Sequence, residues 1–128
     1  MGTQYLLDSN VIIGFLDNRL PDNAMMFVSK VIDETANVSV ISKIEVLRYN
    51  TTEAAMKILE DFMDCSIICE LDAKTVTETI KLCRQYKIKL PDAIIAATCL
   101  VNKYALITRN VKDFVHIAKL KIINPWNL

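Results

Sequence analysis

The segment YLLDSNVII, residues 5–13, joins two apolar runs through the tripeptide Asp-Ser-Asn. The short run Tyr5–Leu7 predicts a β-strand, and the apolar residues from Val11 to Leu16 predict a helix that starts directly after it. An acid at such a junction stands at the carboxyl end of a strand, which is where ligands bind in parallel α/β sheets. The segment therefore predicts the first strand and helix of an α/β fold, and it makes Asp8 a candidate site residue.

The same alternation of short apolar strands and helices continues along the chain. Further strands are predicted over residues 38–41, 66–69, 105–108 and 120–123. Further helices are predicted over residues 23–34, 42–49, 52–63, 73–86 and from Pro91 onward. This alternation is typical of a parallel sheet that is covered by helices on both faces. We therefore expect one domain over residues 1–128, of the α/β class, with three α/β/α layers and a central, mostly parallel sheet of about five strands.

Side-chain patterns within these segments predict which residues are buried and which residue caps a helix. The helix at 23–34 is expected to bury the face that carries Met26, Phe27, Val31 and Ile32. The helix at 73–86 is expected to bury an apolar stripe made of Val76, Ile80 and Cys83. Ser42 is expected to be the N-cap of the next helix after the second strand, because Glu45 follows it at the spacing of a capping box.

Composition and charge exclude several classes of function. The chain has 15 basic and 15 acidic residues, which argues against a protein whose whole surface attracts nucleic acid. A local basic rim remains compatible with RNA binding. The candidate residues for such a rim are Arg48, Arg84, Lys89 and Arg109. For any one of them, solvated surface charge is the simpler explanation. No apolar run approaches the ~20 residues of a membrane span, and the N-terminal residues lack the pattern of a signal peptide. We expect a cytoplasmic protein with no membrane partner.

The cysteines and the one histidine do not suggest a zinc site. Residues 65–69, CSIIC, predict a buried strand, and the other two cysteines fall on helical patterns. All four are expected to be reduced thiols in the core: Cys65, Cys69, Cys83 and Cys99. His116, the only histidine, cannot form a zinc cluster by itself.

Four acidic residues from separate parts of the chain are expected to meet at the carboxyl edge of the sheet. Asp8 ends the first strand, and Glu45 lies one helical turn beyond the second. Asp113 follows the fourth strand together with Asn110, and Asp92 lies in the first turn of the helix that leads into that strand. Crowded carboxylates repel one another unless a cation joins them, and oxygen ligands without Cys or His suit Mg²⁺ or Mn²⁺. Such an ion can activate water and stabilise the charge that develops on a phosphodiester.

Each acid also has an ordinary structural explanation. Asp8 can cap the helix that follows it, and Glu45 can complete a capping box. Asp92 suits the first turn of a helix because of the helix dipole, and Asp113 suits a solvated loop. We favour the metal site because all four acids fall at the same predicted edge.

Four motifs, taken in order, resemble those of the PIN-domain family. LLDSNVII (6–13) resembles the opening motif, in which a strand runs into Asp-Ser/Thr-Asn. SKIEVLRY (42–49) and LPDAIIAATCL (90–100) are similar to the second and third motifs, and ALITRNVKDF (105–114) followed by KIINPW (121–126) resembles the fourth motif and the chain end. The length and the ending are most like those of VapC-type toxins.

The resemblance implies a divalent-metal-dependent endoribonuclease that cleaves RNA phosphodiesters by means of a metal-activated water. It makes Asp8, Glu45, Asp92 and Asp113 the catalytic and metal-binding acids, with Mg²⁺ or Mn²⁺ as the cofactor. Asp113 matches the fourth acid in members that read TRNxxDF, whereas other members place an acid at the position of Asn110. The polar residues that would support the acids are Ser9, Asn10, Thr108 and Asn110. The implied partners are RNA, a cognate antitoxin protein of a type II toxin–antitoxin pair, and a second copy of the chain in a homodimer.

Three other functions are possible alternatives for this pattern. A phosphoacceptor receiver domain fits poorly, because the first strand ends in the single acid Asp8 and the last strand ends in Asn124-Pro125. A catalytically inactive PIN-like binding module would be expected to lack one or more of the acids, and this chain retains all four candidates. A PIN-like nuclease that processes RNA, rather than a toxin, remains open at this point.

Overall fold

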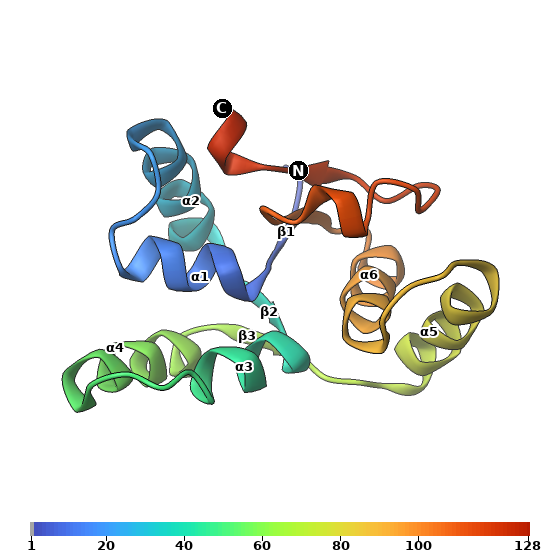
Figure 1. The fold of residues 1–128 in the computed structure, drawn as a ribbon, viewed down its shortest axis with the longest axis horizontal. Coiled ribbons are helices and arrows are strands. Elements are labelled where there is room, and N and C mark those ends of the chain that lie inside the picture. The colour runs from blue at the N-terminus through green and yellow to red at the C-terminus, as the bar shows by residue number, and fades with distance from the viewer. Residues whose placement is uncertain (1) are drawn as a thin grey trace.

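A computed structural model describes residues 2–128, which contain a five-stranded sheet with helices on both faces (Figure 1). The strands are β1 (Tyr5–Leu7), β2 (Asn37–Ser39), β3 (Ile67–Cys69), β4 (Ala105–Ile107) and β5 (Ile122–Ile123). They lie in the order β3-β2-β1-β4-β5, and every neighbouring pair is parallel. The prediction of an α/β fold with a parallel sheet of this size is confirmed.

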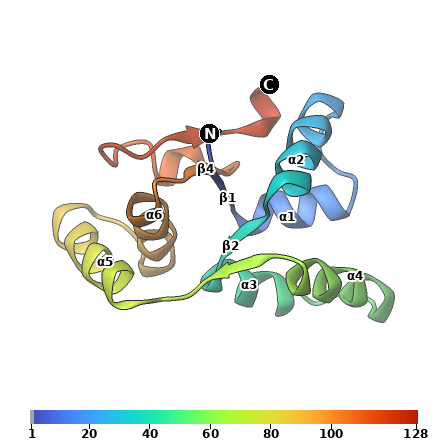
Figure 2. The same cartoon turned by 180° about the vertical axis from the view of Figure 1, so that it is seen from behind.

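Two groups of helices cover the two faces of the sheet and give the three expected layers. The helices are α1 (Ser9–Leu16), α2 (Asp22–Glu34), α3 (Val40–Leu47), α4 (Glu53–Asp64), α5 (Ala73–Gln85) and α6 (Leu90–Asn102). Figures 1 and 2 show α5 and α6 together on one side of the sheet, with α1, α2 and α4 on the other. The short 3-10 helices η1 (Val111–Asp113) and η2 (Pro125–Asn127) follow β4 and β5. Among the described residues, no helix is long and apolar enough to pass through a lipid bilayer.

Each face of the sheet has its own apolar core, because successive side chains of a strand point to opposite faces. In β1, Leu7 belongs to the core that includes residues of α1, α2 and α4, whereas Leu6 belongs to the core that includes α5 and α6. Ile107 and Leu106 of β4 divide between the two cores in the same way. Burial of both faces explains why these central strands are uniformly apolar rather than alternating.

The strand order places the carboxyl ends of β1 and β4 side by side. From β1 the chain adds β2 and then β3 on one side, and the connection through α5 and α6 then carries it to β4 on the other side of β1. Leu7 is the register partner of Ile107, and the Asp8 N–H donates to the Ile107 carbonyl at 3.0 Å. A switch in strand order of this kind is where open α/β sheets bind ligands.

The boundary between β2 and α3 differs from the predicted strand at 38–41 with its Ser42 cap. β2 ends at Ser39, whose hydroxyl accepts a hydrogen bond from the Ile41 N–H at 3.1 Å and caps α3. A serine hydroxyl that satisfies a free helical N–H favours the start of a helix, even where the following residues are β-branched. Ser42 therefore lies inside α3, and the predicted capping box with Glu45 does not form.

The buried face of α2 differs from the predicted one at Met26. The Met26 side chain is 73% exposed, whereas Ala24, Val28 and Val31 are buried. The other predicted residues of this face are buried or half-buried. Only Met26 was therefore assigned to the wrong face of the helix.

The thiols differ from the prediction in their burial. All four cysteines are free, as predicted, but Cys65 and Cys83 are exposed and only Cys99 is fully buried. Cys65 follows the last turn of α4, and the strand β3 after it lies at the edge of the sheet, where Ile67 is exposed. The segment 65–69 is therefore not a buried strand, because an edge strand has a neighbour on one side only.

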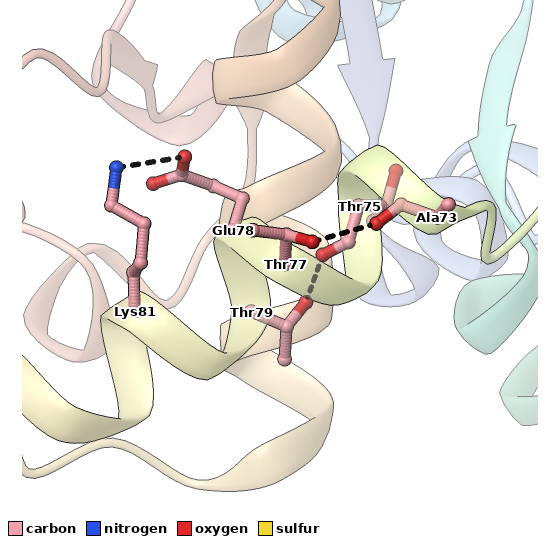
Figure 3. A network of polar contacts seen from close by, with 6 residues as sticks. All are labelled: Ala73, Thr75, Thr77, Glu78, Thr79 and Lys81. Atoms are coloured by element: carbon pink, nitrogen blue, oxygen red, sulfur yellow. Dashed lines mark hydrogen bonds and ion pairs between the residues drawn. The ribbon is translucent and has the colours of Figure 1, made fainter.

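The buried face of α5 carries threonines where the sequence predicted an apolar stripe. Thr75, Thr79 and Leu82 are buried, whereas Val76, Ile80 and Cys83 are exposed. The buried hydroxyls have partners: Thr75 Oγ1 donates to Asp72 Oδ1 and Thr79 Oγ1 donates to the Thr75 carbonyl, both at 2.7 Å. Figure 3 shows the second of these bonds, with the ion pair between Lys81 and Glu78 (3.7 Å) nearby on the same helix. Burial of a hydroxyl that has a hydrogen-bond partner costs little free energy, so the threonines of α5 can face the core.

We predict that Leu82→Ala and Ile80→Ala will differ strongly in their effect on stability. Leu82 is 3% exposed, so its truncation leaves a cavity and is expected to cost about 2–5 kcal/mol of unfolding free energy. Ile80 is 50% exposed, so its truncation is expected to cost roughly 0.5 kcal/mol or less. Urea denaturation of the two variants measures the difference, and equal losses would restore the apolar stripe as the buried face.

Candidate functional site

Asp8 lies at the junction of β1 and α1, and hydrogen bonds fix its carboxylate. It is the N-cap of α1, and its Oδ1 accepts a hydrogen bond from the Ser9 N–H at 2.9 Å. Its Oδ2 accepts from Thr108 Oγ1 at 2.7 Å and from Asn10 Nδ2 at 3.4 Å. The side chain is 5% exposed. Asp8 thus caps the helix and also presents a fixed carboxylate at the carboxyl edge of the sheet.

Burial changes the acidity of this carboxylate. Removal from water raises the pKa of Asp8 above its ordinary value of 3.8, although the hydrogen bonds that it accepts act in the opposite direction. The negative charge of Asp113 adds to the increase in the pKa of Asp8. This dependence shows that Asp113, which is distant in sequence, lies within electrostatic range of Asp8.

Glu45 is linked to the same junction from the neighbouring helix. Ser9 Oγ donates to Glu45 Oε1 at 3.2 Å, so α3 and the start of α1 are joined by a side-chain hydrogen bond. Ser42 precedes Glu45 by one helical turn, and residues at this spacing lie on the same face of a helix. The Ser42 hydroxyl is buried and has no hydrogen-bond partner among residues 2–128. Ser42 was predicted as a cap, and its three-residue spacing to Glu45 is the sequence signal that places it near the site.

Asp92 shows most clearly that the four acids are near one another. It lies half-buried in the first turn of α6, directly after Pro91. Burial is the largest cause of its raised pKa, and the charges of Asp113, Asp8 and Glu45 raise that pKa further. Lys89 lowers the pKa of Asp92, but the net direction is upward. The structure therefore places the other three predicted acids within electrostatic range of Asp92.

The loop after β4 holds the remaining polar residues against this cluster. The Asn110 N–H donates to Thr108 Oγ1 at 3.1 Å, and the Arg109 N–H donates to Asn10 Oδ1 at 3.3 Å. The Asn110 and Asp113 side chains are exposed, and Asp113 lies in η1. Asn110 thus supports the site through its backbone, whereas Asp113 affects it through its charge.

The chemistry of these residues fits a hard divalent cation. The available ligands are carboxylate oxygens, and the oxygen of Ser42 is a further buried donor atom without a partner in the described chain. In the part of the chain that the structure describes, no three His, Cys, Asp or Glu side chains are close enough together to hold an ion as they stand. Carboxylates repel one another without a counter-ion, so the acids would move together as a cation neutralises them.

Comparison with known proteins gives a family and a set of structural relatives. The sequence model that defines the PIN-domain family matches residues 5–120 of the chain. A toxin–antitoxin complex from Klebsiella pneumoniae contains a similar chain, with 25% identity, a TM-score of 0.76, and coverage of 95% of this chain and 98% of that chain. VapBC-1 from nontypeable Haemophilus influenzae matches with 25% identity, a TM-score of 0.78, and coverage of 98% and 100%. DNA-bound VapBC from Salmonella typhimurium shares the fold, with 18% identity, a TM-score of 0.80, and coverage of 97% and 99%. No curated protein matches the sequence.

We predict that Asp92→Asn will raise the midpoint of thermal unfolding at neutral pH in the presence of EDTA. Because the folded pKa of Asp92 lies above 3.8, the charged carboxylate costs stability at neutral pH, and this cost is lost as the pH falls through the raised pKa toward 3.8. The gain of the variant is therefore expected to shrink as the pH is lowered over that window. The difference in unfolding midpoint between the variant and the parent protein is measured by circular dichroism during heating, at a series of pH values.

Asp72→Asn is the matched control for this measurement. Hydrogen bonds from Thr75 lower the pKa of Asp72, so its charged form contributes stability at neutral pH that is lost as the pH falls through the lowered pKa. The two substitutions should shift the midpoint in opposite directions at neutral pH. A lower midpoint for Asp92→Asn would contradict the crowding of acids at this edge.

Proposed function

The chain belongs to the PIN-domain family, and on that basis we propose that it is a divalent-metal-dependent endoribonuclease, the toxin of a type II toxin–antitoxin pair. The observation that carries the proposal is the pair of hydrogen bonds that fix two acids at the carboxyl edge of the sheet. Thr108 Oγ1 donates to Asp8 Oδ2 at 2.7 Å, and Ser9 Oγ donates to Glu45 Oε1 at 3.2 Å. Asp92 lies within electrostatic range of both carboxylates. Clustered carboxylates at the switch point of a parallel sheet suit metal-assisted hydrolysis of a phosphodiester. The structural similarity to toxin–antitoxin complexes supports the toxin role over a role in RNA processing.

The proposed roles of the residues follow from their contacts. Asp8, Glu45, Asp92 and Asp113 would hold one or two Mg²⁺ or Mn²⁺ ions. A bound ion of this kind lowers the pKa of water and neutralises charge on the phosphate. The Asp8 carboxylate is kept in one orientation by Thr108 and by the start of α1, and Ser9 does the same for Glu45. Such outer partners fix ligands in place before the ion arrives, which reduces the entropy lost on binding.

The surface formed by α1, α3 and α4 supports the proposed antitoxin partner. A shallow hollow between α1 and α4 is lined mostly by apolar side chains, among them Ile13, Leu16, Tyr49 and Ile58. Tyr49 and Ile58 are also exposed, as is Ile44 on α3. Exposed apolar side chains around a hollow are typical of a surface that binds a partner protein. We further propose a homodimer, as the resemblance implies, and action in the cytoplasm, where the RNA substrate is found.

We predict that the purified protein will cleave RNA with Mg²⁺ or Mn²⁺ and that EDTA will abolish the cleavage. Asp8→Asn is expected to lower the rate by about a hundredfold or more, because loss of a ligand should exceed the 10–100-fold typical of outer partners. The assay is gel analysis of total RNA with each metal and with EDTA. Circular dichroism and thermal unfolding check that the variant is folded. Equal cleavage by the parent protein and the folded Asp8→Asn variant would remove the assignment of Asp8.

A separate comparison assigns the fourth acid. Asp113 acts on the pKa of both Asp8 and Asp92, whereas the one hydrogen bond of Asn110 to the site comes from its backbone. We therefore predict that Asp113→Asn will lower the cleavage rate about tenfold or more, and that Asn110→Ala will change it by less than that. Initial rates at saturating Mn²⁺ give the ratio, and a larger loss for Asn110→Ala would reverse the assignment.

A further inference from the structure

Arg109 is fixed at the rim of the acid cluster by its own backbone. It follows Thr108, whose hydroxyl donates to Asp8 Oδ2 at 2.7 Å. The Arg109 N–H donates to Asn10 Oδ1 at 3.3 Å, and Asn10 Nδ2 donates in turn to Asp8 Oδ2 at 3.4 Å. The side chain of Arg109 is exposed. Because its backbone lies at the rim of the acid cluster, this side chain begins next to the proposed site of phosphodiester cleavage.

The guanidinium of Arg109 is stacked over the indole of Trp126. Its Cζ lies 4.7 Å from the ring centroid, within the roughly 6 Å at which a cation–π contact is attractive. Trp126 belongs to η2 and packs against the core on the α1–α2 face of the sheet. The chain therefore provides a partly buried aromatic platform for an arginine at the site.

Gly14 of α1 lies next to Trp126. A Cβ at Gly14 would lie 3.1 Å from Leu20 Cδ2 and 3.6 Å from Trp126 Cζ2. The first distance is tighter than ordinary van der Waals contact, so a side chain at this position would disturb the packing of Leu20 next to Trp126. The absence of a side chain at Gly14 thus leaves room for Leu20, while Trp126 lies at an ordinary contact distance from the same position.

The contact that the structure shows for the Arg109 guanidinium is with Trp126 rather than with the acids. Over residues 2–128, the ion pairs within 4.0 Å join other residues, and none joins the Arg109 guanidinium to a carboxylate of the cluster. A guanidinium that paired with these acids would compete with a divalent cation for the same oxygens. A cation–π contact attracts the charge without using the N–H groups as an ion pair would, so they stay available to another acceptor.

The geometry points to Arg109 as the residue that binds a phosphate of the RNA backbone beside the acid cluster, with Trp126 as the residue that positions it. The inference rests on the proposed function, because the phosphate is that of the RNA substrate. A cluster of carboxylates repels a polyanion, and a chain with no net charge has no general attraction to offset this repulsion. A fixed guanidinium supplies a local cation whose planar set of donors matches a phosphate.

The salt dependence of RNA binding tests this assignment. A fluorescein-labelled single-stranded RNA of mixed sequence is titrated with the Asp8→Asn protein, which leaves the RNA uncut, in Mg²⁺ at several KCl concentrations. The slope of log affinity against log salt is expected to weaken by about 0.7 when Arg109→Ala is added, as for the loss of one phosphate contact. The affinity is expected to fall about tenfold, as for a charge-assisted hydrogen bond.

Three further variants in the same background separate the charge from its position. Arg109→Lys keeps the charge and is expected to restore the slope, but only part of the affinity, because an ammonium lacks the planar fork of donors. Trp126→Phe, checked for folding by thermal unfolding, should lower affinity a few-fold with the slope unchanged, because phenylalanine gives a weaker cation–π contact. Arg19→Ala is the matched control, since Arg19 is an exposed arginine beyond the end of α1 whose guanidinium lies 3.7 Å from Asp17. It should leave both slope and affinity unchanged.

Each contrary result has a distinct meaning. An unchanged slope for Arg109→Ala with lower affinity would overturn the phosphate contact in favour of base stacking. An equal loss of slope for Arg19→Ala would overturn it in favour of diffuse attraction over the whole surface. Failure of the proposed function is recognised separately, because the protein with intact Asp8 would then cut no RNA with Mg²⁺ or Mn²⁺, and no variant would bind the RNA.

Discussion

The hydrogen bond between Thr108 and Asp8 is the interaction on which the site depends, because it joins the ends of the two strands at the switch in strand order. β1 and β4 are 100 residues apart at this point, and the contact forms only when the α5–α6 connection has carried the chain across the sheet. The bond satisfies a buried hydroxyl and orients a buried carboxylate. Completion of the sheet and assembly of the acid cluster are therefore the same structural event.

The crowding of these acids lowers the stability of the folded chain. Asp8 is buried with a raised pKa, and Asp92 carries the repulsion of three other acids, so the cluster opposes folding while no cation is bound. A ligand that binds only the folded chain adds to its stability by mass action. An ion that joined the carboxylates would therefore stabilise the fold as well as enable the chemistry. The repulsion that destabilises the fold and the proposed metal binding thus arise from the same group of carboxylates.

The sequence predicted the parts of the fold that depend on strong local signals. Apolar runs marked all five strands, and their alternation with helices predicted the parallel sheet, so the residue pattern alone was enough to place Asp8 at a strand end. Burial on α5 could not be read from polarity alone, because Thr75 and Thr79 go inward only when their hydroxyls find acceptors in the same helix or at its cap. The start of α3 was misplaced for a related reason, since the Ser39 hydroxyl competes with a β-branched strand pattern.

The contact between Arg109 and Trp126 could not be predicted from the sequence, for a different reason. This contact also bears on how an acidic site can act on a polyanion. Arg109 lies in the loop after β4 and Trp126 lies in η2, so their contact forms only when the folded chain brings two distant segments together. A site that collects carboxylates for a metal must also attract phosphates, and one cation placed among the acids would defeat the first requirement. Holding the arginine on an aromatic ring at the rim separates the two tasks in space. In the proposed nuclease, the acids would keep their charge for a divalent ion, while the arginine would keep its donors for the backbone of the RNA.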